Sequence, residues 1–309
     1  MKEVREKVHA EVAKVVVGQT PTIDAMLAAA AVGGHVLLEG VPGTAKTLLA
    51  QAVARALGLT FARAQFTPDM LPSDLTGTMT LRGQDLVFRR GPVFTQLLLA
   101  DEINRTPPKT QAALLEAMSE GQVSVDGVSH PLPKPFLVVA TQNPIEYEGT
   151  YPLPEAQLDR FLMKIEVGYP NEDQERDMLR MERDGLAPAT LIEVEAVTDA
   201  DGLLTGRRLV ETTTVSDEVV SYVTSITRRS RDLPSVELGA SPRSSVHLLA
   251  AAKAIARMSG RDFVTPDDVA RMAVPVLRHR ILVRPEAELD GYTPDDAVRA
   301  ALASVEVPR

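Results

Sequence analysis

The sequence predicts an α/β fold in which a parallel sheet is covered by helices on both faces and is followed by a smaller helical domain. Strand-like and helical patterns alternate through the first half of the 309-residue chain. A loop at residues 40–47 with two glycines joins one of these strands to a helix. Beyond about Asn171 the strand patterns nearly vanish and amphipathic helices take over. We therefore expect an α/β core over residues 1–170 and a helical domain over 171–309.

The composition is that of a globular protein and restricts the classes of function. Hydrophobic residues make up 44% and charged residues 24% of the chain, which argues against an extended disordered protein. The absence of cysteine excludes thiol catalysis, disulfides and cysteine-ligated metals. A formal charge of −9 would repel nucleic acid at long range and argues against nucleic acid as a partner.

No segment has the pattern of a membrane anchor or of a secretory signal. The longest uncharged apolar stretch, residues 25–38, is interrupted by two glycines and is too short to span a bilayer. The N-terminal segment mixes both charge signs and lacks the apolar region of a secretory signal. We therefore expect no membrane insertion and a cytoplasmic location.

Short apolar runs predict the strands of the core. They cover residues 35–39, 60–65, 93–100, 135–141 and 164–168. The run at 93–100 is almost wholly apolar, which is typical of a strand that is buried on both faces.

End signals predict three helices in the same half of the chain. The first is capped by Thr20 and stops at Gly33. The second covers residues 46–57, where apolar residues recur at helical spacing. The third is capped by Thr106 and stops at Gly121.

Two hairpin insertions, at about residues 66–92 and 121–134, interrupt the alternation. The second contains Asp126-Gly127 between alternating residues, which is a strong signal of a tight turn. In the helical domain the clearest helices are predicted at residues 217–229, 244–258 and 266–274. The stretch at 185–214 is rich in turn and β-branched residues and predicts no definite element.

The loop at residues 40–47 has the pattern of a phosphate-binding loop. A loop that leaves a buried strand and enters a helix directs backbone N–H groups and the positive end of the helix dipole at one point. Lys46 would pair with the β- and γ-phosphates, and Thr47 would ligate Mg²⁺. Ala45 stands where the usual pattern has glycine, so a plain turn with a solvated lysine is the alternative. The expected nucleotide contacts are Gly40, Val41, Pro42, Gly43, Thr44, Ala45, Lys46, Thr47 and Leu48.

Two adjacent carboxylates follow the apolar run that ends at Ala100. Asp101 and Glu102 would be costly at the end of a buried strand unless they served a cation and a water. We assign Asp101 to Mg²⁺, which it would bind through a water, and Glu102 to polarising an attacking water. An exposed acidic turn would explain the two residues but not the hydrophobic run that precedes them.

These motifs resemble the AAA+ superfamily of P-loop NTPases, and within it the MoxR branch. The resemblance rests on the loop at 40–47 and on the segments 66–74, 100–105, 107–118 and 140–144. Alanine before the lysine is ordinary in that branch, which removes the objection to Ala45. The resemblance covers residues 17–280 and implies a parallel-sheet core with an all-α lid. It also places the hairpins among the insertions that line the axial opening of a ring in the helix-2-insert group.

The resemblance implies roles for residues that the pattern alone leaves open. Asn143 would orient the attacking water, as the family's sensor 1 residue does. Arg160 matches an arginine finger that acts in a neighbouring subunit's site, and Arg105 is a weaker candidate for that role. Arg243 matches the sensor 2 arginine, which reaches the γ-phosphate of its own subunit from the lid. From the residues alone, a turn asparagine and exposed or ion-paired arginines are the alternatives.

The same resemblance implies an ATPase that uses ATP and Mg²⁺ in a ring of identical subunits, six in number by analogy with the family. Val17, Gly18 and Gln19 match the segment that packs against adenine. The implied task is chaperone-like: the remodelling or activation of a client protein. The client in this family is often a protein with a von Willebrand A domain, and the task is sometimes the insertion of a metal or cofactor.

Two other functions compete with this interpretation. A nucleic-acid remodeller is one, because related motors include helicases and because Arg82, Arg89 and Arg90 lie near the first hairpin. The acidic net charge and the single aromatic residue of that hairpin, Phe88, weigh against it. A nucleotide-gated scaffold with little turnover is the other, and the joint presence of Glu102, Asn143 and Arg160 argues against it.

Overall fold

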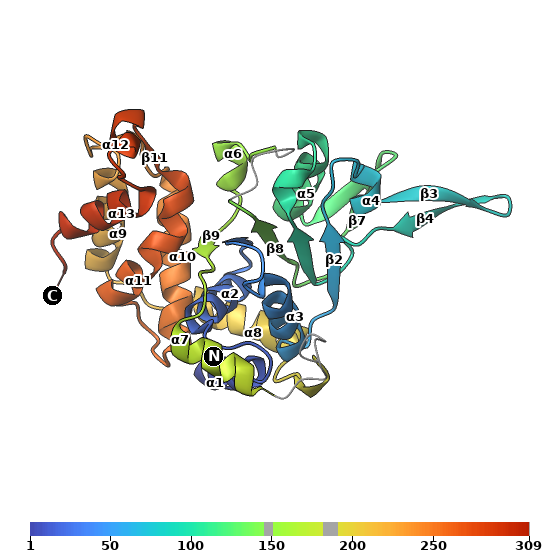
Figure 1. Ribbon diagram of the computed structural model, residues 1–309, viewed down its shortest axis with the longest axis horizontal. Helices are drawn as coiled ribbons and strands as arrows, with labels where there is room; N and C mark the ends of the chain where they lie inside the picture. Colours follow the sequence, from blue (N-terminus) through green and yellow to red (C-terminus); the bar gives the residue numbers. More distant parts are fainter. Residues whose placement is uncertain (145–150, 182–190, 309) are drawn as a thin grey trace.

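A computed structural model describes residues 1–144, 151–181 and 191–308 of the chain. Its central element is a sheet of five parallel strands in the order β2-β5-β8-β1-β9 (Figure 1). The strands are β1 (Val36–Glu39), β2 (Phe61–Gln65), β5 (Leu97–Asp101), β8 (Leu137–Gln142) and β9 (Met163–Glu166). The parallel sheet and its covering helices confirm the predicted α/β fold.

Alternate side chains of the strands enter two different apolar layers. Leu38 on β1 packs in the layer formed with α2 (Thr20–Val32) and α3 (Lys46–Ala56). Leu37, its neighbour in sequence, packs in the layer formed with α5 (Pro108–Glu120). Burial on both faces explains why the strands are continuous apolar runs in the sequence.

The predicted strand at 93–100 is wrong at its start. The backbone amides of Phe94 and Thr95 donate to the carbonyls of Gly91 and Val93 at 3.2 and 2.8 Å, so residues 93–96 form a turn. The strand begins at Leu97 and extends to Asp101. Apolar burial without alternation cannot distinguish a buried turn from a buried strand.

The two predicted caps are each displaced by one residue. Thr20 is the first residue of α2, and Gln19 occupies the capping position. Pro107 occupies the capping position of α5 instead of Thr106. Because Pro108 disfavours helical geometry in the residue before it, Pro107 remains extended and the helix begins one residue later.

Both hairpins are present and antiparallel. The first pairs β3 (Gly77–Arg82) with β4 (Asp85–Arg90), and it projects away from the sheet at the right of Figure 1. The second pairs β6 (Gln122–Val125) with β7 (Val128–Pro131). The ring of Phe88 in β4 stacks on that of His130 in β7 with centroids 4.1 Å apart. The insertions therefore contact each other through their side chains.

The C-terminal helices form a body beside β9, at the left of Figure 1. Its helices are α9 (Asp217–Arg229), α10 (Pro242–Met258), α11 (Pro266–Leu277), α12 (Pro285–Leu289) and α13 (Pro294–Ala303). The body also contains a small antiparallel pair, β10 (Val236–Leu238) and β11 (Leu282–Val283), so it is not purely helical. Among the described helices, none has both the length and the apolar character needed to cross a membrane.

Several helices were not predicted from the sequence. The longer ones within residues 1–211 are α1 (Lys2–Ala13), α7 (Glu172–Arg180) and α8 (Ala200–Glu211). Helix α8 lies in the stretch at 185–214, for which no element was predicted, and residues 185–190 of that stretch fall outside the described residues. It packs against α2 of the core. The expected division near residue 170 stays a prediction.

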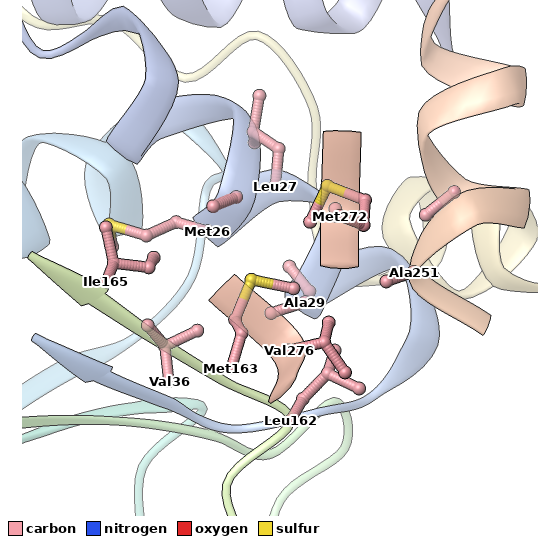
Figure 2. Packing of buried hydrophobic residues seen from close by; sticks show 14 of the residues in the cluster. Met26, Leu27, Ala29, Val36, Leu162, Met163, Ile165, Ala251, Met272 and Val276 are labelled. Atoms are coloured by element: carbon pink, nitrogen blue, oxygen red, sulfur yellow. The ribbon is translucent and has the colours of Figure 1, made fainter. Parts of the chain in front are cut away.

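One apolar cluster connects the sheet with the helical body. Figure 2 shows Met26 of α2 and Val36 of β1 close to Met163 of β9, with Met272 and Val276 of α11 beside them. All five side chains are buried. The helical body therefore packs on the edge strand β9 and on α2 through a continuous core.

Candidate functional site

A cavity of about 790 Å³ lies at the carboxyl end of β1. From β1 the chain continues to β2 at the far edge of the sheet, whereas β9 lies on the opposite side of β1. Open α/β sheets bind ligands at the carboxyl ends of strands where the connections run to opposite sides in this way. The predicted residues that line the cavity are Val17, Gln19, Pro42, Gly43, Thr44, Ala45, Lys46, Thr47, Leu48, Asp101, Glu102 and Asn143. Gly40 and Val41 are joined to it through a hydrogen bond from Lys46.

The backbone of the loop is constrained at three positions, by a close approach at Gly40 and by a positive φ at Gly43 and Ala45. A Cβ atom on Gly40 would lie 2.4 Å from the carbonyl oxygen of Val167, so no larger residue fits there. Gly43 has a φ of 84°, in the region that glycine favours. Ala45 also has a positive φ, 59°, immediately before α3. The loop is therefore held close to neighbouring backbone, with its N–H groups at the start of a helix.

Lys46 is folded back over this loop. Its Nζ donates to the carbonyl oxygens of Gly40 and Val41 at 2.5 and 2.8 Å. Burial lowers the pKa of the Lys46 ammonium, and the nearby charges of Asp101 and Glu102 oppose that shift. The ammonium is thus poised at a site where the oxygens of a phosphate would replace the carbonyl oxygens as acceptors.

Thr47 and Asp101 provide the oxygen atoms that suit a magnesium ion. The Thr47 hydroxyl lies 3.3 Å from Asp101 Oδ2, and the Thr141 hydroxyl donates to Asp101 Oδ1 at 2.6 Å. Within the described residues no cluster of three or more His, Cys, Asp or Glu side chains could hold a metal. Two hard oxygen ligands with few others fit Mg²⁺, which keeps several waters and binds phosphate oxygens.

Glu102 is held by Gln65, which was not predicted as a site residue, and by Arg105. The Gln65 amide donates to the Glu102 carboxylate at 2.6 Å, and Arg105 forms an ion pair with it at 3.3 Å. The backbone N–H of Glu102 donates to the Thr141 hydroxyl at 2.8 Å. Arg105 is thus paired within its own subunit, although it was a candidate for contact with a neighbouring one.

Arg63 was also missed, and it binds Asp101 directly. Its Nε and one terminal nitrogen donate to Asp101 Oδ2 at 2.9 and 2.7 Å. Gln65 stands opposite Asp101 in the parallel pairing of β2 with β5, and Arg63 lies two residues before it on the same face. The shared carboxyl edge of neighbouring strands is the signal that could have identified both residues, once their pairing is known.

Asn143 and the expected adenine segment lie where the prediction placed them. Asn143 follows β8, is buried and lines the cavity. Val17 and Gln19 line the cavity, and Gly18 lines an adjoining hollow next to α1. Gly18 has a φ of 78°, and a Cβ atom there would overlap the Gln174 side chain at 2.3 Å. Glycine is therefore required for this turn.

Arg160 and Arg243 do not line the cavity of their own subunit among the described residues. Arg160 follows α6 (Glu155–Leu158) and donates to the Leu115 carbonyl at 3.3 Å and to the Ser119 hydroxyl. Arg243, in the first turn of α10, lies 3.6 Å from Asp159 Oδ2, and its side chain is 61% exposed. Arg243 thus contacts Asp159, whereas Arg160, the next residue along the chain, contacts α5.

A buried arginine, Arg280, ties this region to the helical body. It donates to Asp159 Oδ1 at 2.7 Å and to the carbonyls of Phe161 and Leu162 at 2.5 and 3.0 Å. Its guanidinium also donates to His247 Nδ1 at 2.6 Å. Burial, together with the charge of Arg280, lowers the pKa of His247 to about 4, so this ring stays neutral and accepts the hydrogen bond.

The fold and the cavity define a P-loop NTPase of the AAA+ type with a lid. Residues 35–163 match the family described as "ATPase family associated with various cellular activities (AAA)". Residues 228–301 match the AAA lid domain. The first match covers β1, β2, β5 and β8 of the core sheet and ends at the first residue of β9, and the second covers most of the helical body.

Individual relatives identify the family within the AAA+ class to which the chain belongs. The YeaC protein of Bacillus subtilis strain 168 is 47% identical over 297 residues, which are 96% of this chain and 92% of that protein. Chaperone MoxR1 of Mycobacterium tuberculosis is 44% identical over 315 residues, covering 98% of this chain and 82% of its own length. The crystal structure of a putative ATPase from Cytophaga hutchinsonii matches with a TM-score of 0.91 and 40% identity, covering 99% of this chain and 96% of its own. The chain belongs to the MoxR family of AAA+ ATPases.

Proposed function

We propose that this protein hydrolyses ATP to ADP and phosphate with the help of Mg²⁺. The observation that carries the proposal is the meeting of Lys46, Thr47 and Asp101 in one cavity, with Thr47 Oγ1 3.3 Å from Asp101 Oδ2. An ammonium group beside a hydroxyl and a carboxylate is suited to a polyphosphate with its metal ion. Membership of the AAA+ family supports nucleotide binding in general.

The proposed chemistry assigns one task to each polar side chain of the cavity. Lys46 would bind the β- and γ-phosphates, while Thr47 and Asp101 would hold Mg²⁺. The metal ion would neutralise charge that develops on the phosphate oxygens. Glu102 would accept a proton from the attacking water. The oxygen of that water would bond to the γ-phosphorus while the bond from this phosphorus to the β–γ bridging oxygen breaks. Asn143 would orient that water.

The positions of Arg160 and Arg243 support a site that is shared between subunits. Arg243 contacts Asp159, Arg160 contacts α5, and neither lines its own cavity in the described residues. We propose that both reach the phosphates in a neighbouring subunit of a ring, a hexamer by analogy with the family. For Arg243 this differs from the action within one subunit that the sequence resemblance implies.

We propose that the work done by hydrolysis is the remodelling or activation of a client protein. The naming of the 44% identical Mycobacterium tuberculosis relative as a chaperone supports this task. A client with a von Willebrand A domain, and the insertion of a metal or cofactor, are proposals that rest on the family resemblance. The cytoplasmic location stays a prediction. A rise in ATPase rate with such a client, and none with DNA, separates this task from nucleic-acid remodelling.

Substituting the carboxylate and the ammonium separately tests the ATPase proposal. Glu102→Gln should bind ATP yet release phosphate about a hundredfold more slowly, because the proton acceptor is lost. Lys46→Ala should lose ATP binding itself, as measured by calorimetry. Glu237→Gln, an exposed change in β10, is the matched control and should leave both measurements unchanged. Undiminished hydrolysis in Glu102→Gln would refute the role of Glu102.

A further inference from the structure

The carboxylate of Asp101 already has a cation on the oxygen that faces Thr47. Arg63 donates two hydrogen bonds to Asp101 Oδ2, at 2.9 and 2.7 Å, and Thr47 Oγ1 lies 3.3 Å from the same atom. The other oxygen, Oδ1, accepts from Thr141 at 2.6 Å. Both oxygens of the carboxylate are therefore engaged by the protein.

We propose that Arg63 is a positioning residue that holds Asp101 in the metal-free protein and exchanges with Mg²⁺ when nucleotide is loaded. This inference rests on the proposed function, in which the cavity takes ATP with Mg²⁺. Thr47 and Asp101 are the hydroxyl and carboxylate nearest each other at the loop, so Oδ2 is the oxygen that would turn toward the metal.

Arg63 and Mg²⁺ would compete for Asp101 because both are positively charged. A guanidinium and a divalent cation on the same carboxylate oxygen repel each other strongly at a separation of a few ångströms. Leaving Asp101 alone is also costly, because its side chain is only 9% exposed and an unpaired buried charge is destabilising. Arg63 would neutralise this carboxylate until the metal ion arrives.

The Arg63 side chain is exposed enough to move away from Asp101, and it has another acceptor nearby. Its side chain is 47% exposed and stands on β2, the edge strand of the sheet. Its guanidinium also donates to the side-chain oxygen of Gln65 at 2.6 Å. After release from Asp101 the charge can therefore remain near Gln65 and solvent without crossing the core.

Breaking the Arg63–Asp101 pair would therefore make the binding of Mg²⁺ less favourable in free energy. Nucleotide that arrives without metal leaves the Arg63–Asp101 pair intact, whereas nucleotide with Mg²⁺ must break it. Removing the guanidinium should therefore favour Mg²⁺–ADP over ADP alone. The measurable quantity is the ratio of the ADP dissociation constant in EDTA to that in excess Mg²⁺.

The experiment compares this ratio, by calorimetry with ADP, for wild type, Arg63→Gln and the control Arg228→Gln. Arg228 is exposed on α9 and carries the same change in charge. Arg63→Gln should raise the ratio roughly tenfold, because two charged hydrogen bonds no longer compete with the metal. Arg228→Gln should give the wild-type ratio. Arg63→Lys, which keeps the charge but not the two-bond geometry, should fall between them.

Two results would contradict the exchange. An unchanged ratio in Arg63→Gln overturns it, and if both affinities fall by the same factor Arg63 is a phosphate ligand instead. A raised ratio that persists when Asp101→Asn is added also overturns it, because the effect would not pass through that carboxylate. If wild type binds ADP under neither condition, the proposed function falls together with the exchange. Binding by wild type with an unchanged ratio refutes the exchange alone.

Discussion

Ala45 stands in the left-handed conformation at the entrance to α3, with φ at 59°. A methyl group in that region is strained by about 1 kcal/mol, and only the surrounding loop maintains it. The sequence identified Ala45 as a departure from the glycine of the usual pattern, and the backbone explains why glycine is usual there. The departure does not displace the loop, because Lys46 and Thr47 still line the cavity.

Glycine at this position should therefore stabilise the fold. We expect Ala45→Gly to raise the free energy of unfolding by up to about 1 kcal/mol, as strain is relieved at some cost in chain entropy. Ala45→Val should lower it, because a β-branched residue is poorly tolerated at positive φ. Urea unfolding measures both variants. A stabilised valine variant would show that the loop is not strained at this residue.

Local patterns predicted some residues of the site and could not predict others. Lys46, Thr47 and Asp101 belong to motifs that are continuous in sequence, so a strand followed by a loop was enough to locate them. Arg63 meets Asp101 only because β2 pairs with β5, and nothing in the sequence alone fixes that pairing. Arg280 is hidden for the same reason, since its partner Asp159 is distant in the chain.

Among the elements, α8 shows how tertiary contacts override local propensity. It contains Gly202 and Gly206, which disfavour a helix, and the sequence predicted no element there. Leu203, Gly206 and Val210 form its buried face, and the helix packs against α2. Asp199 caps it by accepting from the Gly202 amide at 2.8 Å. The cap was visible in the sequence, but the packing that stabilises the helix was not.

Arg280 forms hydrogen bonds that connect the helical body to the segment that contains Arg160. Its side chain is 2% exposed and its hydrogen bonds satisfy Asp159 and backbone carbonyls of residues 161 and 162. Arg280→Met should lower the free energy of unfolding by about 3 kcal/mol, because Asp159 loses its buried cation and the carbonyls of residues 161 and 162 lose a charged donor. Urea unfolding provides the measurement.

The exposed Arg228→Met serves as the control for Arg280→Met, and its effect should stay within about 0.5 kcal/mol. Equal effects of the two substitutions would contradict the role of Arg280 as a buried link.

Asp24 connects three helices through one buried carboxylate. Arg5 and His9 of α1 lie 2.6 and 2.7 Å from it, and Arg271 of α11 lies at 2.5 Å. Burial alone would raise the pKa of Asp24, but the hydrogen bonds from Arg5 and His9 outweigh burial and lower it. The carboxylate is thus ionised in the fold at neutral pH and stabilises the contact of α1 and α11 with α2.

This lowered pKa fixes the direction of a pH dependence. The contribution of Asp24 is complete above the pKa of the unfolded chain, about 3.9, and is lost as the pH falls through the lower pKa of the folded state. Asp24→Asn should therefore cost about 2 kcal/mol at pH 7 and progressively less below pH 4. The exposed Asp262→Asn is the control. A difference that grows on acidification would contradict this sign.

At the scale of the whole molecule, the division into an α/β core and a helical lid was predictable because the period of the apolar pattern changes along the chain. The continuous core around Met163 and Met272 was not predictable, since it joins β9 to α11 across more than a hundred residues. In the same packing Arg243 contacts Asp159, and among the described residues neither Arg160 nor Arg243 lines its own cavity. On the proposed function, a second copy of the chain would supply these arginines to the site.

The most direct test of that shared site mixes two inactive variants. Lys46→Ala lacks a working loop but keeps Arg160, and Arg160→Ala keeps the loop but lacks the arginine. When both are co-expressed, roughly a quarter of the interfaces in a randomly mixed ring pair a working loop with a working Arg160. We predict that the mixture recovers part of the ATPase rate, although each variant alone is inactive. A mixture as inactive as its components would show that Arg160 does not act in a neighbouring subunit.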